Sequence, residues 1–265
     1  IISVVETEKY LDFFLCAFSS ILKSCSKWLT KSIKPQIDPQ KQAKDVWEEF
    51  CKQILKMERA NETSEVVEEN NAEILTQSVL ELNITEPFVD LLVTSPPYVT
   101  SYEYADIHQL STLWLDYSPD YKHFRTGSIG SLYHSCDLRF NVPKLNQSGL
   151  TVVMQMYSVD KKQAKAIAQY YVNMQEVVKK ICNIVKKGGA CLFVIGNTEY
   201  KNVKIDNARH LAESLLNEGF YNVTIKRRKI LNKILTPYRD KNGKFSSDKT
   251  SRKIYSEEFL IFAQL

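Results

Sequence analysis

The feature that most constrains the fold is an apolar run that stops at two consecutive prolines. Phe88-Val89-Asp90-Leu91-Leu92-Val93-Thr94 has the length and composition of a β-strand buried in a parallel sheet, and Ser95-Pro96-Pro97-Tyr98 follows it directly. Proline cannot donate to a sheet or continue a helix, so the turn lies at the carboxyl end of the strand. Ligands bind at that edge in open α/β sheets. The run therefore predicts an α/β fold with a candidate site at residues 95–98.

Two amphipathic helices are predicted in the C-terminal half, each with an aspartate at its start and glycine at its end. The first begins at Asp160 and is stopped by Gly188-Gly189. The second begins at Asp206 and ends at Gly219.

Three further strands are predicted around these helices. Residues 190–195 form an apolar, buried strand between the two helices. Residues 221–230 and 254–263 read as a closing hairpin, hence an antiparallel pair. The alternation of helices and strands predicts the later half of a mixed α/β sheet.

The N-terminal part has a different pattern. We expect a helix over residues 5–31, a second helix that starts near Asp38 or Gln40, and an exposed Glu/Asn-rich stretch over residues 61–71. A short strand is predicted within residues 74–80.

These elements suggest two domains. Residues 1–71 form a helical segment and residues 72–265 an α/β domain, with a loop insertion at about 116–159 and a basic hairpin loop at about 231–253.

The turn after the first strand has the chemistry to hold a planar amine. The Ser95 hydroxyl and the Pro96 carbonyl can accept hydrogen bonds, Pro97 stiffens the turn, and Tyr98 offers an aromatic face. Two acceptors beside a ring suit a heterocycle with an exocyclic NH2 group, whose nitrogen they would aim at an electrophile.

The stretch from Val89 to Tyr98 resembles the catalytic motif of S-adenosylmethionine-dependent DNA amino-methyltransferases, which methylate N4 of cytosine or N6 of adenine. The similarity continues into Tyr102-Glu103-Tyr104-Ala105-Asp106-Ile107-His108-Gln109-Leu110. It covers residues 72–265, with residues 88–115 the most specific. Serine at the first motif position looks most like the cytosine-N4 enzymes, although some adenine enzymes share it.

The resemblance implies a class I methyltransferase fold, which is Rossmann-like, and a modification methyltransferase that uses S-adenosylmethionine. Ser95 and Pro96 would accept from the amine of a base that has left the duplex stack, and Tyr98 would stack on that base. The methyl group would pass directly to the amine, with no covalent enzyme intermediate. Thr94 and Ser78 would lie on the cofactor side, although Gln77 replaces an acidic residue of the family there.

The glycine content departs from the family pattern. The chain has eight glycines, none before Gly127, and therefore neither a Gly-x-Gly-x-x-Gly loop nor a Walker-type loop. The chain also begins at Ile1, and its first methionine is Met57. We expect the cofactor loop to lie either upstream or on a partner chain of a split enzyme.

Basic residues suggest where DNA would bind. Residues 226–253 contain eleven basic and two acidic residues, whereas residues 45–90 contain three basic and twelve acidic ones. The basic segment fits a polyanion contact or a solvated loop equally well by charge alone. With DNA as the expected partner, the predicted DNA-binding residues are Tyr102, Arg125, Lys226, Arg227, Arg228 and Lys229. Asn197, just past a strand, is a further candidate for contact with the base.

The remaining composition gives no competing site. The six cysteines are scattered, as expected of reduced thiols in a cytoplasmic protein, and no histidine or cysteine spacing predicts a metal site. No apolar run approaches the length of a membrane span. Two alternatives remain: a non-catalytic nucleic-acid-binding module with a degenerate methyltransferase fold, and methyl transfer to RNA or to a protein amide nitrogen.

Overall fold

In the computed structural model, the chain folds into two compact units. One comprises Ile1–Leu75 and Tyr104–Gly127, and the other comprises Thr76–Glu103 and Ser128–Leu265. The structure describes residues 8–29, 32, 35–63, 72–84, 86–99, 103–131, 133, 136–230, 238–240, 246–253 and 256–265.

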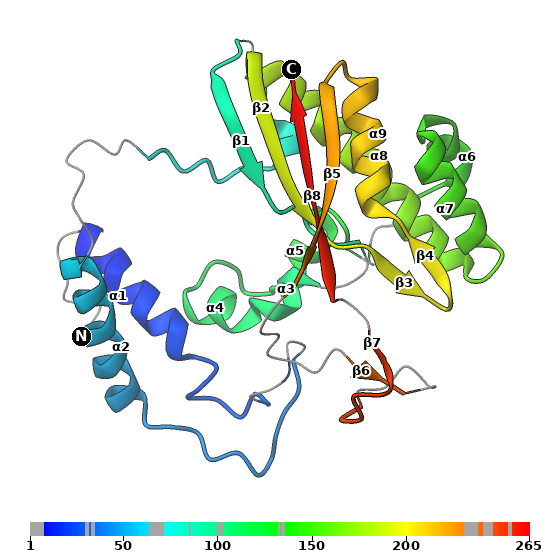
Figure 1. The fold of residues 1–265 in the computed structure, drawn as a ribbon. Coiled ribbons are helices and arrows are strands. Elements are labelled where there is room, and N and C mark those ends of the chain that lie inside the picture. Colours follow the sequence, from blue (N-terminus) through cyan, green and yellow to red (C-terminus); the bar gives the residue numbers. More distant parts are fainter. Residues whose placement is uncertain are drawn as a thin grey trace. The chain divides into compact units, whose positions relative to one another are not determined.

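The second unit contains a four-stranded mixed sheet, which confirms the predicted α/β class (Figure 1). Its strands lie in the order β1 (Val89–Thr94), β2 (Val185–Ile195), β8 (Glu257–Gln264) and β5 (Tyr221–Lys229). β1 and β2 are parallel, and β8 is antiparallel to both of its neighbours. The predicted closing hairpin is thus confirmed, with β8 lying between β2 and β5.

Two helices pack against this sheet, and both begin where the sequence predicts. Asp160 caps α8 (Lys161–Ile184) by accepting from the backbone N–H of Gln163. Asp206 caps α9 (Asn207–Asn217) in the same way. Gly219, just beyond α9, has a φ of +89°, a conformation that favours glycine. Within the described residues, no helix combines the length and the apolar character that crossing a membrane requires.

Gly188 and Gly189 do not stop α8, contrary to the sequence-based prediction. α8 ends at Ile184, β2 begins at once, and the two glycines lie inside β2, where the pairing with β1 shifts register. Gly188 has a φ of +83°, and a Cβ on Gly189 would lie 2.8 Å from the Lys186 carbonyl oxygen and 3.0 Å from that of Asp90. The pair therefore forms an irregularity in the ladder that side chains would obstruct.

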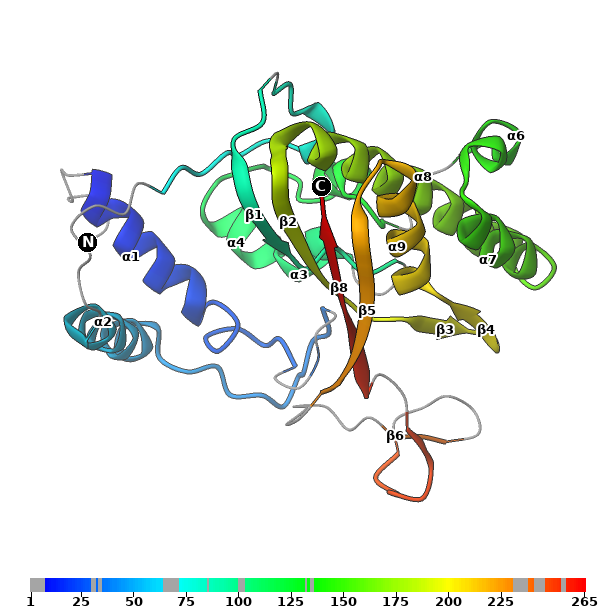
Figure 2. The same ribbon diagram turned by 45° about the horizontal axis from the view of Figure 1, so that its top comes forward.

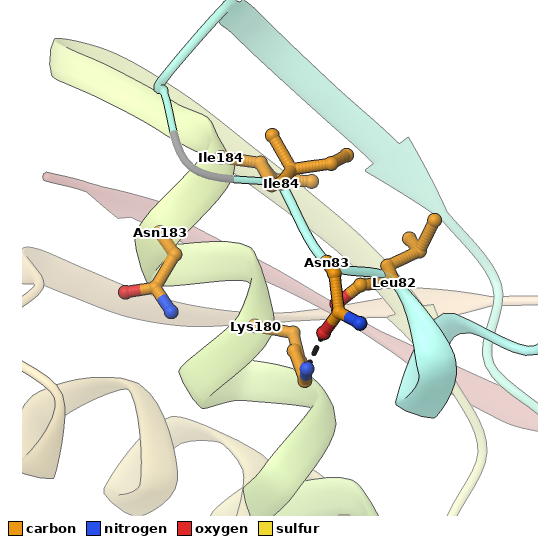
Figure 3. A pocket seen from close by; sticks show the side chains of 6 residues that line it. All are labelled: Leu82, Asn83, Ile84, Lys180, Asn183 and Ile184. Atoms are coloured by element: carbon orange, nitrogen blue, oxygen red, sulfur yellow. Dashed lines mark hydrogen bonds between the residues drawn. The ribbon is translucent and has the colours of Figure 1, made fainter.

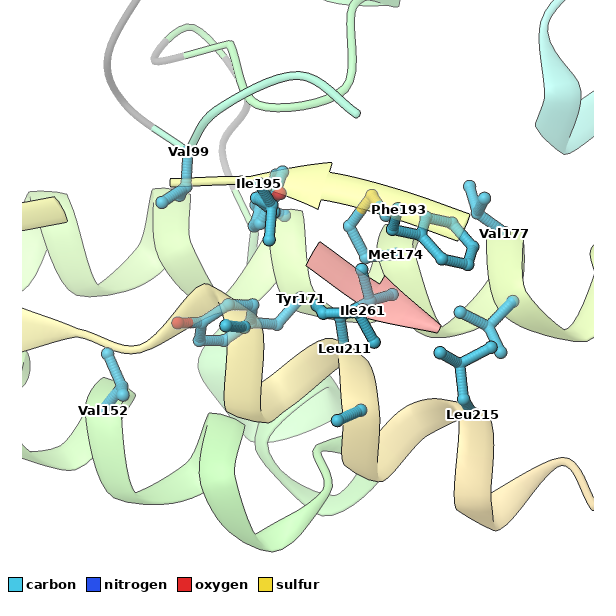
Figure 4. Close-up of a cluster of buried hydrophobic side chains, with 14 of the residues drawn as sticks. Val99, Val152, Tyr171, Met174, Val177, Phe193, Ile195, Leu211, Leu215 and Ile261 are labelled. Atoms are coloured by element: carbon cyan, nitrogen blue, oxygen red, sulfur yellow. The ribbon is translucent and has the colours of Figure 1, made fainter. Parts of the chain in front are cut away.

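One face of the sheet packs on α8 and α9 and forms the main hydrophobic core (Figures 2 and 4). Phe193 and Ile195 on β2 and Ile261 on β8 are at most 1% exposed. Figure 4 shows them beside the side chains of the two helices. The residues of α8 and α9 labelled there are Tyr171, Met174, Val177, Leu211 and Leu215.

The opposite face of the sheet is not covered by any described element of the second unit. Leu91 and Val93 of β1 are 60% and 61% exposed, and Phe262 of β8 is 36% exposed. Val93 pairs with Leu192, and Leu192 pairs with Phe262, so these side chains share one face. β1 was expected to be buried on both faces. Its inner face is only partly buried, where Val89 and Leu92 pack against the core, because β1 is an edge strand of the described sheet. Its outer face is exposed, because no described element of the second unit covers it.

Residues 116–159, where we expected a loop insertion, contain helices. In the second unit these are α6 (Leu138–Asn141), the 3-10 turn η3 (Val142–Lys144) and α7 (Gln147–Tyr157). Asn146 caps α7 by accepting from the Gly149 N–H, and its Nδ2 donates to the His210 carbonyl of α9. One asparagine therefore joins α7 to α9.

Residues 74–80 do not form the predicted strand. Val79–Glu81 is a 3-10 turn, η2, and the hydroxyl of Ser78 accepts from the Leu80 N–H at its start. Serine favours this turn because its side chain supplies the capping acceptor. Two short antiparallel pairs complete the unit: β3 (Thr198–Tyr200) with β4 (Val203–Ile205), and β6 (Tyr238–Arg239) with β7 (Arg252–Lys253).

The first unit contains α1 (Glu8–Ile21), α2 (Val46–Thr63), α3 (Tyr104–Ile107), α4 (Gln109–Trp114) and α5 (His123–Gly127). α1 and α2 share a small core of Ala17, Ile21 and Phe50. Phe18 of α1 packs edge-on against Trp114 of α4.

Both N-terminal helices are shorter than predicted. α1 ends at Ile21, whose carbonyl accepts from both the Ser24 hydroxyl and the Cys25 N–H. α2 starts at Val46 because the carboxylate of Asp45 accepts from the Glu48 N–H, which makes Asp45 the cap.

Candidate active site

Residues 95–98 lie where β1 ends, beside the end of the parallel strand β2. The Ser95 hydroxyl donates to the Val194 carbonyl of β2 at 3.0 Å, and the side chain is exposed. A hydroxyl has one proton and two lone pairs, so this bond leaves the oxygen able to accept. Because its proton is bonded to the Val194 carbonyl, the Ser95 hydroxyl can offer a ligand only its lone pairs, as an acceptor.

The two proline carbonyls have different surroundings. The Pro97 carbonyl accepts from the hydroxyl of Tyr170 on α8 at 2.9 Å. For the Pro96 carbonyl, no donor is found among the described residues, although the Pro96 ring is buried. Ser95 Oγ and Pro96 O thus form two adjacent acceptor groups at the sheet edge.

Tyr98 is the last residue of the loop, and it packs against the backbone at two glycines, Gly196 and Gly130. A Cβ on Gly196, at the end of β2, would lie 3.4 Å from the Tyr98 ring. A Cβ on Gly130 would lie 3.4 Å from both the Tyr98 carbonyl oxygen and the Tyr170 ring, and Gly130 has a φ of +88°. A Cβ at either position would make an ordinary van der Waals contact, so the positive φ, and not the available space, is what favours glycine at residue 130.

A buried polar cluster joins α8 and α9 to the end of β2, without a described hydrogen bond to residues 95–98. Asn207 of α9 accepts from the Tyr171 hydroxyl at 3.4 Å and donates to the Gly196 carbonyl at 2.9 Å. The His210 ring stacks on Tyr171 with centroids 3.9 Å apart. Burial lowers the pKa of His210 to about 3 and raises that of Tyr171 well above its ordinary value, so both groups are neutral near pH 7.

Asn197 is not placed to contact a base through a free amide. Its Nδ2 donates to the Asp206 carboxylate at 2.8 Å, and its Oδ1 accepts from the Ala208 N–H at 3.0 Å. Both ends of the amide are therefore engaged with the start of α9. Asn197 stabilises that helix terminus instead.

Glu103, which follows the loop, was not predicted from the sequence. Its Oε2 accepts from the Ser131 hydroxyl at 2.7 Å, whereas its Oε1 is buried with no hydrogen-bond partner among the described residues. Tyr170 and Gly196 were missed as well. No local sequence signal marks them, since their contacts with the loop depend on the folded chain.

Ser78, expected on the cofactor side, makes no described contact with the loop. Its hydroxyl caps η2, whose C-terminal neighbour Leu82 accepts from Lys180 of α8 at 2.8 Å. A small pocket lies at this position, lined by Leu82, Asn83, Ile84, Lys180, Asn183 and Ile184 (Figure 3). Lys180 is ten residues from Tyr170 along α8, or about 15 Å, so the pocket is remote from the loop.

The predicted DNA-binding residues differ in their ion pairs. Arg125 of the first unit binds the Asp106 carboxylate at 2.7 Å, so its charge is already balanced. On β5, Arg228 binds Glu258 and Arg227 lies 3.6 Å from Glu257.

Lys226 and Lys229, on the same exposed strand, have no ion pair among the described residues. Tyr102 lies outside the described residues. Within the described part of the chain, no group of His, Cys, Asp or Glu side chains could hold a metal ion.

No protein-family model matches the chain. The chain is similar to the Type II methyltransferase M.MvaI of Kocuria varians, with 24% identity over 245 residues. The match covers 83% of this chain but 53% of the relative, so the chain spans about half the length of the curated protein that it matches. The similarity supports a relationship to methyltransferases.

Proposed function

We propose that this chain carries the base-binding part of a DNA methyltransferase that modifies an exocyclic amine. The observation that carries the proposal is the pair of acceptors at the end of β1. The Ser95 proton is used on Val194, and no described donor reaches the Pro96 carbonyl. The serine at the first motif position favours N4 of cytosine, and N6 of adenine is the alternative.

The loop would hold the amine in the orientation that transfer requires. An exocyclic NH2 has two N–H bonds, which Ser95 Oγ and Pro96 O can accept together. With both hydrogens held in the plane of the base, the nitrogen lone pair, which lies out of that plane, would be free to attack a methyl donor placed above or below the ring. The methylated nitrogen would then release one of its protons to solvent. Tyr98 would stack on the base, which has to leave the duplex stack to reach the sheet edge.

S-adenosylmethionine is the proposed donor and, when bound, would supply the methyl group. The described residues do not form a complete site for it. The chain lacks a Gly-rich turn, and the pocket beside η2 is remote from the loop. We assign Thr94 and Ser78 to the cofactor side. The rest of that site would come from an additional segment or from a partner chain, which we call the cofactor-binding polypeptide. The partnered protein is this chain together with that polypeptide.

Two observations support an additional segment or partner. The relative is about twice as long as the part that this chain matches. The outer face of the sheet exposes Leu91 and Val93, and exposed apolar side chains of this kind are typical of a surface that another protein segment covers. Residues 72–265 would then be the later half of a class I methyltransferase domain, and residues 1–71 a helical addition.

A serine substitution tests the proposal. Ser95→Ala, assayed for methyl transfer to duplex DNA with the cofactor-binding polypeptide present, should lower kcat about 100-fold or more. Ser158→Ala is a matched control, because Ser158 is also exposed and its hydroxyl also donates to a backbone carbonyl, that of Gln155. Mass analysis of the nucleosides would distinguish N4-methylcytosine from N6-methyladenine. Equal activity of the two variants would contradict the proposed role of Ser95.

The missing Gly-rich loop favours a second candidate, a nucleic-acid-binding module without catalysis. Titration of S-adenosylmethionine into this chain and into the partnered protein separates the two. Binding to the partnered protein supports the enzyme, and binding to neither supports the module. Parallel assays on RNA and on peptides test transfer to those substrates.

A further inference from the structure

Tyr170 joins the middle of α8 to the candidate loop, 73 residues earlier in the chain. Its side chain is 2% exposed, and its hydroxyl donates to the Pro97 carbonyl at 2.9 Å. From this contact we infer that Tyr170 is a positioning residue for the proposed methyl transfer. The inference rests on the proposed function and concerns how the loop is held, not which groups touch the base.

The composition of the loop explains why an outside anchor matters. Pro96 and Pro97 have no N–H, so neither residue can tie the loop to the sheet as a backbone donor. The described side-chain hydrogen bonds of residues 95–97 are therefore few. The Ser95 hydroxyl donates to β2, and the Tyr170 hydroxyl donates to Pro97.

The Tyr170 bond acts on the one backbone rotation that proline leaves free. The ring of Pro97 sets its φ, whereas its ψ determines where the Pro97–Tyr98 peptide points. A hydrogen bond to the Pro97 carbonyl fixes that peptide plane. The Pro96 carbonyl lies before this rotation and Tyr98 lies after it. Tyr170 thus sets the stacking ring relative to the amine acceptor.

The surroundings of Tyr170 make it a firm support. Its ring packs beside Tyr171 and against Gly130, where a Cβ would lie 3.4 Å away. α8 begins at a capped terminus and contributes eleven buried residues. A hydroxyl on such a helix restricts the loop more than a surface side chain would, because little rotamer freedom remains in the core.

Hydrogen exchange of this chain tests the anchor without any assay of activity. Tyr170→Phe removes the hydroxyl and keeps the ring. We expect the backbone amides of Tyr98 and Val99 to exchange about five- to tenfold faster in this variant. Tyr171→Phe is the matched control: it removes a hydroxyl from the adjacent buried tyrosine, whose partner is Asn207. Exchange should then stay within about twofold. Equal exchange in the wild type and Tyr170→Phe would overturn the inference.

Kinetics then tests the positioning role. With the partnered protein and duplex DNA, Tyr170→Phe should lower kcat about tenfold and change the KM for DNA less than about twofold, while Tyr171→Phe leaves both near wild type. A kcat equal to wild type would refute positioning. An inactive wild type would refute the proposed function instead, and the exchange rates would still decide whether Tyr170 holds the loop.

Discussion

The two faces of the sheet have similar residue types but opposite environments. Along β2, Phe193 is fully buried against α8 and α9, whereas its neighbour Leu192 points to the other face and is partly exposed. On β1, the side chains of that outer face, Leu91 and Val93, are more than half exposed. Apolar residues on an uncovered face cannot stabilise this chain by burial. The difference shows that the covered face forms the core that stabilises the second unit. The described residues of that unit do not explain why the outer face is apolar as well.

The largest expected effect compares adjacent residues on β2. Phe193→Ala should destabilise the second unit by about 3–5 kcal/mol, because it removes a ring from a packed core and leaves a cavity. Leu192→Ala should cost about 1 kcal/mol or less, because that side chain already contacts solvent. All three tryptophans lie in the first unit, so far-UV circular dichroism in urea, rather than tryptophan fluorescence, is the suitable measurement. Equal losses would contradict the difference between the faces.

The next effect is the pH dependence that His210 adds to the covered face. Its pKa of about 3 lies below the ordinary value of 6.5, so the folded protein holds it neutral while the unfolded chain takes up a proton. Its contribution to stability is fully present above about pH 6.5 and falls by up to about 1.4 kcal/mol per unit as the pH drops toward 3. His210→Phe, which can keep the stack on Tyr171, should flatten this slope between about pH 6 and pH 4.

His123 provides the control, since it is exposed at the start of α5. The slope of His210→Phe is compared with that of His123→Phe, which makes the same exchange of histidine for phenylalanine at an exposed position. If His210→Phe retains the slope of the wild type, other groups cause the acid sensitivity.

A smaller effect concerns the basic residues of β5, which alternate between the two faces. Lys226 and Arg228 share the outer face, and Arg227 and Lys229 share the other. If one face of the strand contacts DNA, Lys226→Ala with Lys229→Ala should reduce the slope of log K against log salt by about 1, as for one lost phosphate contact, because the two lysines lie on opposite faces.

Arg228→Gln should reduce that slope by less than 1, because Arg228 already binds Glu258. Fluorescence anisotropy of labelled duplex DNA at several salt concentrations measures both variants. Unchanged slopes in the double variant would identify the segment as a solvated surface.

The sequence predicted the features that depend on local chemistry. Two consecutive prolines placed the loop at the end of β1, and Asp160 and Asp206 marked the starts of α8 and α9. Each signal acts within a few residues, through a missing N–H or a capping carboxylate. The antiparallel pairing of the closing hairpin, β5 with β8, followed from the same local patterns.

Features that depend on distant contacts could not be predicted. Gly188-Gly189 looks like a helix stop. In the folded chain β2 already begins at Val185, so the two glycines lie where the pairing of β1 with β2 shifts register. Tyr170 looks like one more core aromatic of α8, and only the folded chain brings its hydroxyl to Pro97. The apolar run of β1 fits a strand buried on both faces, and nothing in it reveals that Leu91 and Val93 are exposed in the folded chain.

The smallest expected effect tests that outer face directly. In this chain, Leu91→Ala and Val93→Ala should change the free energy of unfolding by about 0.5 kcal/mol or less, because each side chain is about 60% exposed. The same substitutions should cost about 2 kcal/mol or more when a further layer covers the face, since burial would then be lost and a cavity formed. Urea unfolding of the two variants, alone and with the cofactor-binding polypeptide, measures the change. Small effects in both settings would show that the added polypeptide does not pack on this face, and the apolar character of β1 would then need another explanation.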